Sequence, residues 1–181
     1  IEALKGWARK SCLPILRVLK VYRSYSSIPK GEIDFSQLSH INILNLKEYK
    51  PIKRIAPLTT EYKLYWKFEK LLNDTPQRTF VIEADNWRVW GNQGAVITDT
   101  GHLFKEVSRE FEKPHHSIFK QFKLMPATLL SGTSAIISAS GADMYYHWMF
   151  DILPRIKLLM DCNMTDIIDH YILDYRGINF Q

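Results

Sequence analysis

Cysteine is scarce in this sequence, with only Cys12 and Cys162 among 181 residues. The two lie far apart in segments of helical character, so they form neither a disulfide framework nor a metal-ligand pattern, and a reducing compartment is favoured. Runs of eighteen apolar residues, internal repeats and low-complexity segments are also absent. We therefore expect no transmembrane helix and no repeat architecture.

An initiating methionine and a recognisable signal peptide are missing as well, since the chain begins at Ile1. We expect that both ends have been cut. The composition is that of a globular protein, because 46% of the residues are hydrophobic and 13% are aromatic. A chain of this length can bury one well-formed core. The sequence therefore predicts one main domain with appendages.

Positive charge is concentrated at the N-terminus. Residues 1–25 hold six Lys or Arg against Glu2, which equals the net charge of +5 of the whole chain. A neutral body with one basic end argues against nucleic-acid binding. The apolar residues of this segment share one helical face, with Pro14 interrupting it. Such a helix either packs on its own domain or lies on an anionic membrane surface.

Residues 31–78 carry weaker signals. We expect a strand near residues 41–44, an irregular connector from Lys50 to Pro57, and a short helix from Tyr62 to Leu72. From Thr79 the hydrophobic period changes to two, which predicts an antiparallel β-meander of strands near 80–83, 87–90, 95–98 and 102–107. Asp99-Thr100-Gly101 is its expected hairpin turn, with glycine where a positive φ is needed. His115-His116 is interpreted as solvated loop, and no metal site is predicted.

A segment from Ser138 to Asp161 organises the rest of the chain. Strand-like residues before it and from Ile168 to Tyr175 after it predict a strand–helix–strand unit with parallel strands. Gly141 lies in the loop Ser140 to Asp143, at the carboxyl end of the first strand, where ligands bind in such folds. Asp143 is the expected helix cap, and Pro154 is expected to kink the helix.

Two faces are expected on this helix. His147, Asp151 and Arg155 align on one of them, which makes an acid/base site or, alternatively, a solvated surface with simple ion pairs. The other face is expected to pack in the core. Its residues are Tyr146, Met149, Phe150, Leu153, Ile156 and Met160.

The segment Tyr145 to Arg155, with the sequence YYHWMFDILPR, resembles the signature of glycosyltransferase family 61. The resemblance extends upstream to Val89-Trp90-Gly91 and residues 95–101, and downstream to residues 168–173. It covers roughly the second half of the chain. One departure is Met144, where many members carry asparagine.

The resemblance implies an α/β fold: the Rossmann-like half of a GT-B glycosyltransferase, here with an antiparallel β-meander and an N-terminal amphipathic helix. It implies three regions: a basic amphipathic segment at 1–30, a variable connector at 31–78 and an N-terminal half-domain at 79–181, incomplete at its C-terminus. Because the half of the fold that holds most of the nucleotide-sugar is expected beyond Gln181, we expect a fragment that is inactive in isolation.

The implied activity is a nucleotide-sugar-dependent, inverting sugar transfer in polysaccharide, capsule or glycoconjugate biosynthesis. Its partners would be a nucleotide-sugar and a glycan or glycoconjugate acceptor, with no further cofactor. His147 would be the base, Asp151 would orient it or exchange roles with it, and Arg155 would steady Asp151 or face the diphosphate. Implied substrate contacts come from Tyr145, Tyr146, Trp148 and Gly141.

A different class of protein is also compatible with the sequence. In that alternative the chain is a catalytically inactive interaction or scaffold module, and residues 1–25 dock a membrane or a partner. The expected location is cytoplasmic, with peripheral association at the inner face of the membrane where residues 1–25 bind lipid.

Overall fold

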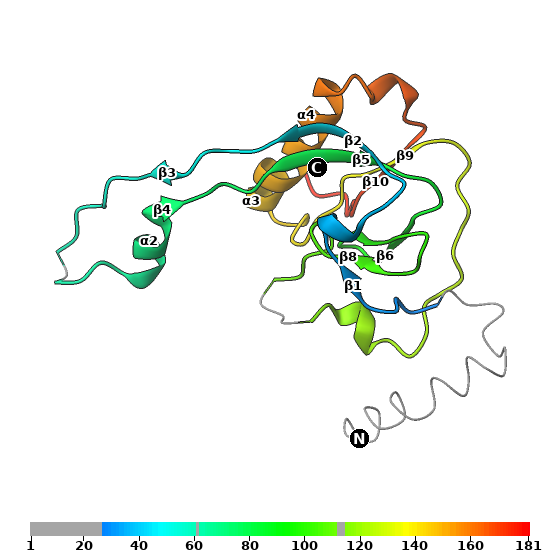
Figure 1. Cartoon of the computed structure of the whole chain (residues 1–181), viewed down its shortest axis with the longest axis horizontal. Helices are drawn as coiled ribbons and strands as arrows, with labels where there is room; N and C mark the ends of the chain where they lie inside the picture. Colours follow the sequence, from blue (N-terminus) through cyan, green and yellow to red (C-terminus); the bar gives the residue numbers. More distant parts are fainter. Residues whose placement is uncertain (1–26, 61, 112–114) are drawn as a thin grey trace. The chain divides into compact units, whose positions relative to one another are not determined.

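The computed structural model describes residues 27–60, 62–111 and 115–181 (Figure 1). The expected helix at 3–25 lies outside these residues. The chain divides into two units, of which unit 2 is Ile41–Glu83 and unit 1 is the remainder. Within the described residues, no helix has the length and apolar character that crossing a bilayer requires. The fold is mixed α/β with small sheets.

Unit 1 contains a four-stranded sheet in the order β1-β8-β7-β6. β6 (Arg88–Trp90), β7 (Ala95–Ile97) and β8 (Leu103–Phe104) form an antiparallel meander, and β1 (Glu32–Ile33) adds in parallel to β8. Between β7 and β8, Gly101 has a φ of +81° and donates its N–H to the carbonyl of Thr98. The expected hairpin turn is therefore confirmed. A positive φ at this position is easily reached only by glycine, which explains why Gly101 stands there.

The meander is one strand shorter than the sequence predicted. β5 (Thr79–Glu83) pairs with β2 (Asn42–Lys47) and so belongs to unit 2. The observed boundary, between Glu83 and Ala84, accordingly differs from the expected one at residue 78. The alternation of residues 79–83 predicted a strand correctly, but alternation carries no information about the pairing partner.

The strand–helix–strand prediction is confirmed in unit 1. β9 (Ser134–Ile136) pairs in parallel with β10 (His170–Ile172), and the helical segment between them runs from Tyr145 to Asp161. This sheet has two strands. A hydrophobic cluster beneath the helix holds Ile137, Ala139, Ala142, Trp148 and Ile152, while a second cluster under the meander is centred on Ile97, Leu103 and Ile118.

The described part of unit 1 also has three short 3₁₀ helices, at Phe35–Gln37 (η1), Ser117–Lys120 (η2) and Thr165–Ile167 (η4). His116 precedes η2 and is only 6% exposed, with Nδ1 accepting a hydrogen bond from the N–H of Ile118. The prediction of a solvated loop at His115-His116 is therefore wrong for His116. Its imidazole caps a helix, which spacing along the sequence does not reveal.

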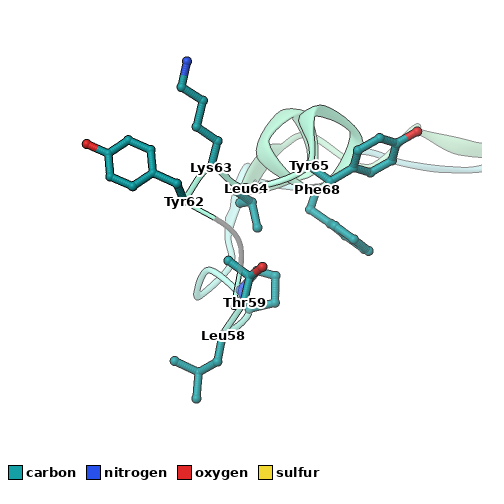
Figure 2. A pocket seen from close by; sticks show the side chains of 8 residues that line it. Leu58, Thr59, Tyr62, Lys63, Leu64, Tyr65 and Phe68 are labelled. Carbon is teal, nitrogen blue, oxygen red and sulfur yellow. The ribbon is translucent and has the colours of Figure 1, made fainter.

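The residues of unit 2 that the structure describes form two-stranded ribbons and one short helix. β2 pairs with β5, and β3 (Ile52–Lys53) pairs with β4 (Asn73–Asp74), with α2 (Trp66–Leu71) just before β4. The predicted strand and helix are confirmed with shifted bounds, whereas β3 was expected to be irregular. Side chains between β3 and α2, including Leu58 and Tyr62, point away from one another (Figure 2).

Candidate active site

The central helix has an unusual middle turn. It runs as α3 (Tyr145–His147), then the π-helical segment η3 (Trp148–Ile152), then α4 (Leu153–Asp161), which has Pro154 in its first turn. A proline inside a helix lacks the N–H and crowds the carbonyl four residues earlier, here that of Phe150. The wider π turn accommodates this clash, so the helix changes its winding before Pro154 instead of breaking there.

The side chains of this helix that face the core differ from the predicted ones. Trp148 is 7% exposed and Ile152 is fully buried, whereas Phe150 is 65% exposed. The predicted core face is therefore wrong for most of its members: Tyr146, Met149, Phe150, Leu153 and Met160 are exposed, and only Ile156 packs against the cluster. Trp148, Ile152 and Ile156 are also spaced four residues apart, so the helix carries two apolar stripes, and the prediction chose the one that is exposed.

His147 and Asp151 contact each other on this helix. Nδ1 of His147 lies 2.5 Å from a carboxylate oxygen of Asp151, and the two side chains are 19% and 42% exposed. Because an ionised carboxylate only accepts, we assign a proton to Nδ1, which leaves Nε2 as the nitrogen available to a substrate. Among the described residues, none forms a hydrogen bond with Nε2.

Aromatic rings and one glycine enclose the imidazole. The ring of Phe111 lies 4.8 Å from that of His147, and Tyr146 makes an edge contact at 5.3 Å. Gly141 has a φ of +79°, and a Cβ built there would lie 2.7 Å from Cδ2 of His147. The loop after β9 thus packs its bare backbone against the imidazole, and glycine is required for that contact.

Arg155 does not join the pair through a direct hydrogen bond. Its Nη1 donates to the main-chain oxygen of Ser138 at 2.7 Å. Burial lowers the pKa of Arg155, and the nearby charge of Asp151 acts in the opposite direction. The side chain of Arg155 is therefore hydrogen-bonded to the backbone of the loop after β9.

A pocket of about 450 Å³ opens beside Gly141. Three parts of unit 1 line it: the turn from Trp90 to Gln93 between β6 and β7, the residues Glu110, His116 and Ser117, and the segments that follow β9 and β10. The last two contribute Ala139, Gly141, Asp143, Asp174 and Arg176. The pocket therefore lies at the carboxyl ends of the parallel strands, where the sequence predicted a ligand site.

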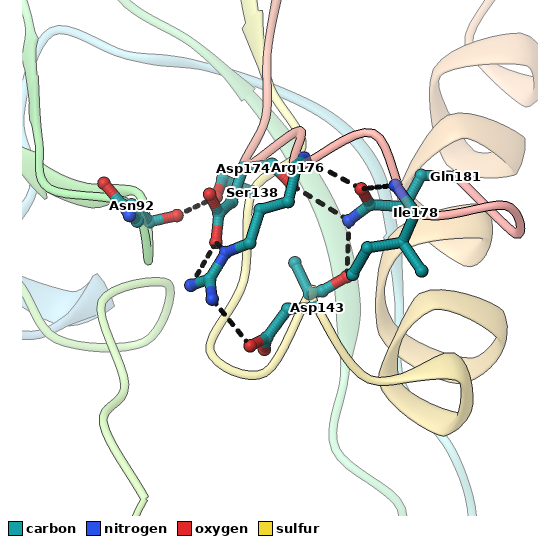
Figure 3. A network of polar contacts seen from close by, with 8 residues as sticks. Asn92, Ser138, Asp143, Asp174, Arg176, Ile178 and Gln181 are labelled. Atoms are coloured by element: carbon teal, nitrogen blue, oxygen red, sulfur yellow. Dashed lines mark hydrogen bonds and ion pairs between the residues drawn. The ribbon is translucent and has the colours of Figure 1, made fainter.

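Arg176 joins the two segments that follow these strands (Figure 3). Its guanidinium lies 2.8 Å from a carboxylate oxygen of Asp143 and 2.9 Å from one of Asp174. The hydrogen bond with Asp174, followed by the charge of Asp143, raises the pKa of Arg176. Asp143 was expected to cap the helix, but no side chain caps α3. The prediction of a cap is wrong because the carboxylate of Asp143 binds Arg176, which lies 33 residues further along the chain.

The predicted substrate-contact residues lie in different places. Gly141 lines the pocket, whereas Trp148 is buried in the cluster beneath the helix and offers little surface to a ligand. Tyr145 and Tyr146 are exposed, and Tyr145 makes an edge contact with Phe180. Sequence reasoning missed Asp174 and Arg176. Their position just after the second parallel strand was the available signal, since it places them beside Gly141.

Comparisons with protein-family models, curated proteins and solved structures returned no match to the chain. Within the described residues, no group of three or more His, Cys, Asp or Glu side chains is arranged to hold a metal ion.

Proposed function

We propose that this chain provides the acceptor side of an inverting, nucleotide-sugar-dependent glycosyltransferase of polysaccharide or glycoconjugate biosynthesis. The observation that carries the proposal is the 2.5 Å contact between Nδ1 of His147 and Asp151, beside a polar pocket. The resemblance of residues 145–155 to the signature of glycosyltransferase family 61 supplies the reaction class, together with the Rossmann-like GT-B half as the proposed fold.

The pair supplies a general base. Asp151 holds the Nδ1–H tautomer of His147, so that Nε2 can accept the proton of an acceptor hydroxyl. The acceptor oxygen then attacks the anomeric carbon of the donor sugar from the face opposite the leaving group. The bond from that carbon to the diphosphate breaks, and the nucleoside diphosphate leaves with the electron pair. Asp151 stabilises the imidazolium that forms, as a buried carboxylate does in hydrolase triads.

The pocket suits the acceptor better than the diphosphate. Asp143, Asp174 and Glu110 contribute three carboxylates, while Arg176 is the cation that pairs with two of them. A surplus of negative charge repels a diphosphate but accepts hydrogen bonds from the hydroxyls of a neutral or cationic glycan. Gly141 belongs both to the pocket wall and to the contact with His147, which supports a role for His147 toward an acceptor bound in this pocket.

Arg155 has a supporting role in this proposal. Because its guanidinium is committed to the carbonyl of Ser138, it fixes the loop that carries Gly141. We accordingly propose it as a positioning residue and not as a ligand of the diphosphate. Residues 1–25 extend the proposal to a cytoplasmic protein at the inner face of the membrane, through the six basic side chains of that segment.

The test is an assay of the complete gene product with a panel of nucleotide-sugars and glycan acceptors, following release of the nucleoside diphosphate. We expect release that depends on the acceptor, and a product whose anomeric configuration, read from the proton coupling of the new linkage, is inverted relative to the donor. Retention of configuration would contradict the role of His147. Absence of turnover across the panel would instead favour the interaction module that the sequence also allows.

A further inference from the structure

Within residues 41–60 and 62–83, unit 2 has no buried core of its own. Every described residue from Ile41 to Glu83 is exposed or only partly buried. Ribbons of two strands, such as β2–β5 and β3–β4, cannot enclose apolar side chains on both faces. Unit 2 nevertheless carries many apolar residues, and a soluble protein seldom leaves a large contiguous apolar patch uncovered unless it binds something.

The exposure is greatest between β3 and β4. We define the aromatic tip as Ile55, Leu58, Tyr62, Tyr65, Trp66 and Phe68. Ile55, Leu58 and Tyr62 are 95%, 103% and 100% exposed, and the three aromatic residues of and beside α2 are each more than half exposed. Figure 2 shows Leu58, Tyr62 and Phe68 pointing in different directions. They line a cavity of about 660 Å³. Tyr65 contacts the rings of Trp66 and Phe68 at 5.8 Å and 6.1 Å, yet all three stay more than half exposed.

The tip is also basic. Residues 50–72 hold six Lys or Arg against two Glu, which gives a net charge of +4. Lys67 lies over the ring of Trp66 at 5.6 Å, and Lys63 lines the cavity beside Tyr62. Lysines with long aliphatic stems can lie along apolar surface while their ammonium groups reach a negative one. Aromatic rings and ammonium groups therefore alternate along the same short segment.

We propose that the aromatic tip docks on an anionic lipid surface. Trp and Tyr prefer the headgroup region of a bilayer, because their rings are apolar and their N–H or O–H groups remain hydrated there. Aliphatic side chains such as Leu58 enter the boundary with the acyl chains, and the surrounding lysines bind acidic headgroups. The charge of +4 is what favours lipid over a protein partner, because the cores of protein interfaces are depleted in lysine.

The test measures sedimentation of the whole chain with vesicles of phosphatidylcholine alone, and with vesicles in which phosphatidylserine replaces about a third of it. Every variant is made in a background where the six Lys and Arg of residues 1–25 are glutamine, so that this segment does not contribute.

An apolar variant combines Leu58→Ser, Tyr62→Ser and Trp66→Ser. A charge variant combines Lys63→Gln, Lys67→Gln and Lys70→Gln. The matched control combines Met125→Ser, Leu129→Ser and Tyr175→Ser, which are large apolar residues of unit 1 that are also more than half exposed.

We expect the background protein to bind the phosphatidylserine vesicles and to be released by high salt. The charge variant should bind about 100-fold more weakly, at about five-fold for each lysine. The apolar variant should lose at least about ten-fold, and the control should bind like the background.

Three results would overturn the proposal: equal binding of both tip variants and the background, equal loss in the control, or equal binding to both kinds of vesicle. A lipid-free dimer that the apolar variant converts to monomer, seen by analytical ultracentrifugation, would assign the tip to a second copy of the chain instead.

Discussion

Arg155 donates a hydrogen bond of 2.7 Å from Nη1 to the main-chain oxygen of Ser138, which joins helix α4 to the loop after β9. Ser138 is 1% exposed, and its hydroxyl donates to the main-chain oxygen of Asn92 in the turn between β6 and β7. The two bonds connect the helix, the parallel strands and the meander at one point. That point lies at the edge of the candidate active site, because Asn92 lines the pocket.

The first prediction follows from this connection. Arg155→Ala leaves the buried carbonyl of Ser138 without its charged donor, which should lower the free energy of unfolding by about 1–3 kcal/mol. Lys157→Ala is the control, since Lys157 is exposed and pairs with Asp161 on the same helix. Its loss should be under about 0.5 kcal/mol. Urea unfolding followed by circular dichroism measures both, and equal stability of the two variants would show that the bond to Ser138 contributes nothing.

Gly141 supports a second prediction. A Cβ at this position must adopt a φ of +79° and also meets the imidazole of His147 at 2.7 Å. Gly177→Ala is the control, because its φ is +68° and nothing lies within 4 Å of the added Cβ. Both variants should lose about 1–2 kcal/mol through backbone strain. Only Gly141→Ala should displace the imidazole ring, which would change the ¹⁵N and ¹³C resonances of His147. Unaltered resonances of His147 would mean that the loop moves and the ring stays in place.

The sequence was most informative where a local pattern decides the structure. The turn at Gly101 and the parallel pair around the central helix follow from glycine chemistry and hydrophobic period, and both are present. The spacing of His147 and Asp151 likewise predicted their contact, because residues four apart share one side of a helix.

Contacts between residues far apart in the sequence could not be predicted from local sequence patterns. The capping role predicted for Asp143 failed because Arg176 binds that carboxylate, and the meander lost a strand because β5 pairs with β2. The core face failed for a third reason. Trp148, Ile152 and Ile156 share one helical stripe and the predicted residues share another, so periodicity alone did not show which of the two is buried.

The observed core face gives a third prediction. Ile152 is fully buried beneath the helix, so Ile152→Ala should cost about 2–5 kcal/mol through the cavity that it leaves. Phe150→Ala removes a larger side chain from an exposed position and should change stability much less, even though regular helical spacing assigned it to the core. Thermal unfolding of the two variants shows which of the two apolar stripes of the helix is buried. A greater loss at Phe150 than at Ile152 would contradict the observed burial of Ile152.

The pairing of His147 with Asp151 gives the last prediction. If Nε2 of His147 takes the proton of an acceptor hydroxyl, His147→Ala should lower kcat by about 10²–10⁴ in the complete gene product, with a verified donor and acceptor. Asp151→Asn should also slow turnover, because an amide no longer holds the Nδ1–H tautomer or stabilises the imidazolium. The double variant should then lose much less than the product of the two single losses, since residues that act as one unit are not additive.

Asp161→Asn is the matched control: Asp161 is a similarly exposed carboxylate that pairs four residues apart with Lys157 on the same helix. Its turnover should equal that of the unaltered enzyme. The measurements are kcat and KM for the acceptor, with unfolding midpoints for each variant. Full turnover by His147→Ala together with a lowered midpoint would make the pair a purely structural contact of the helix.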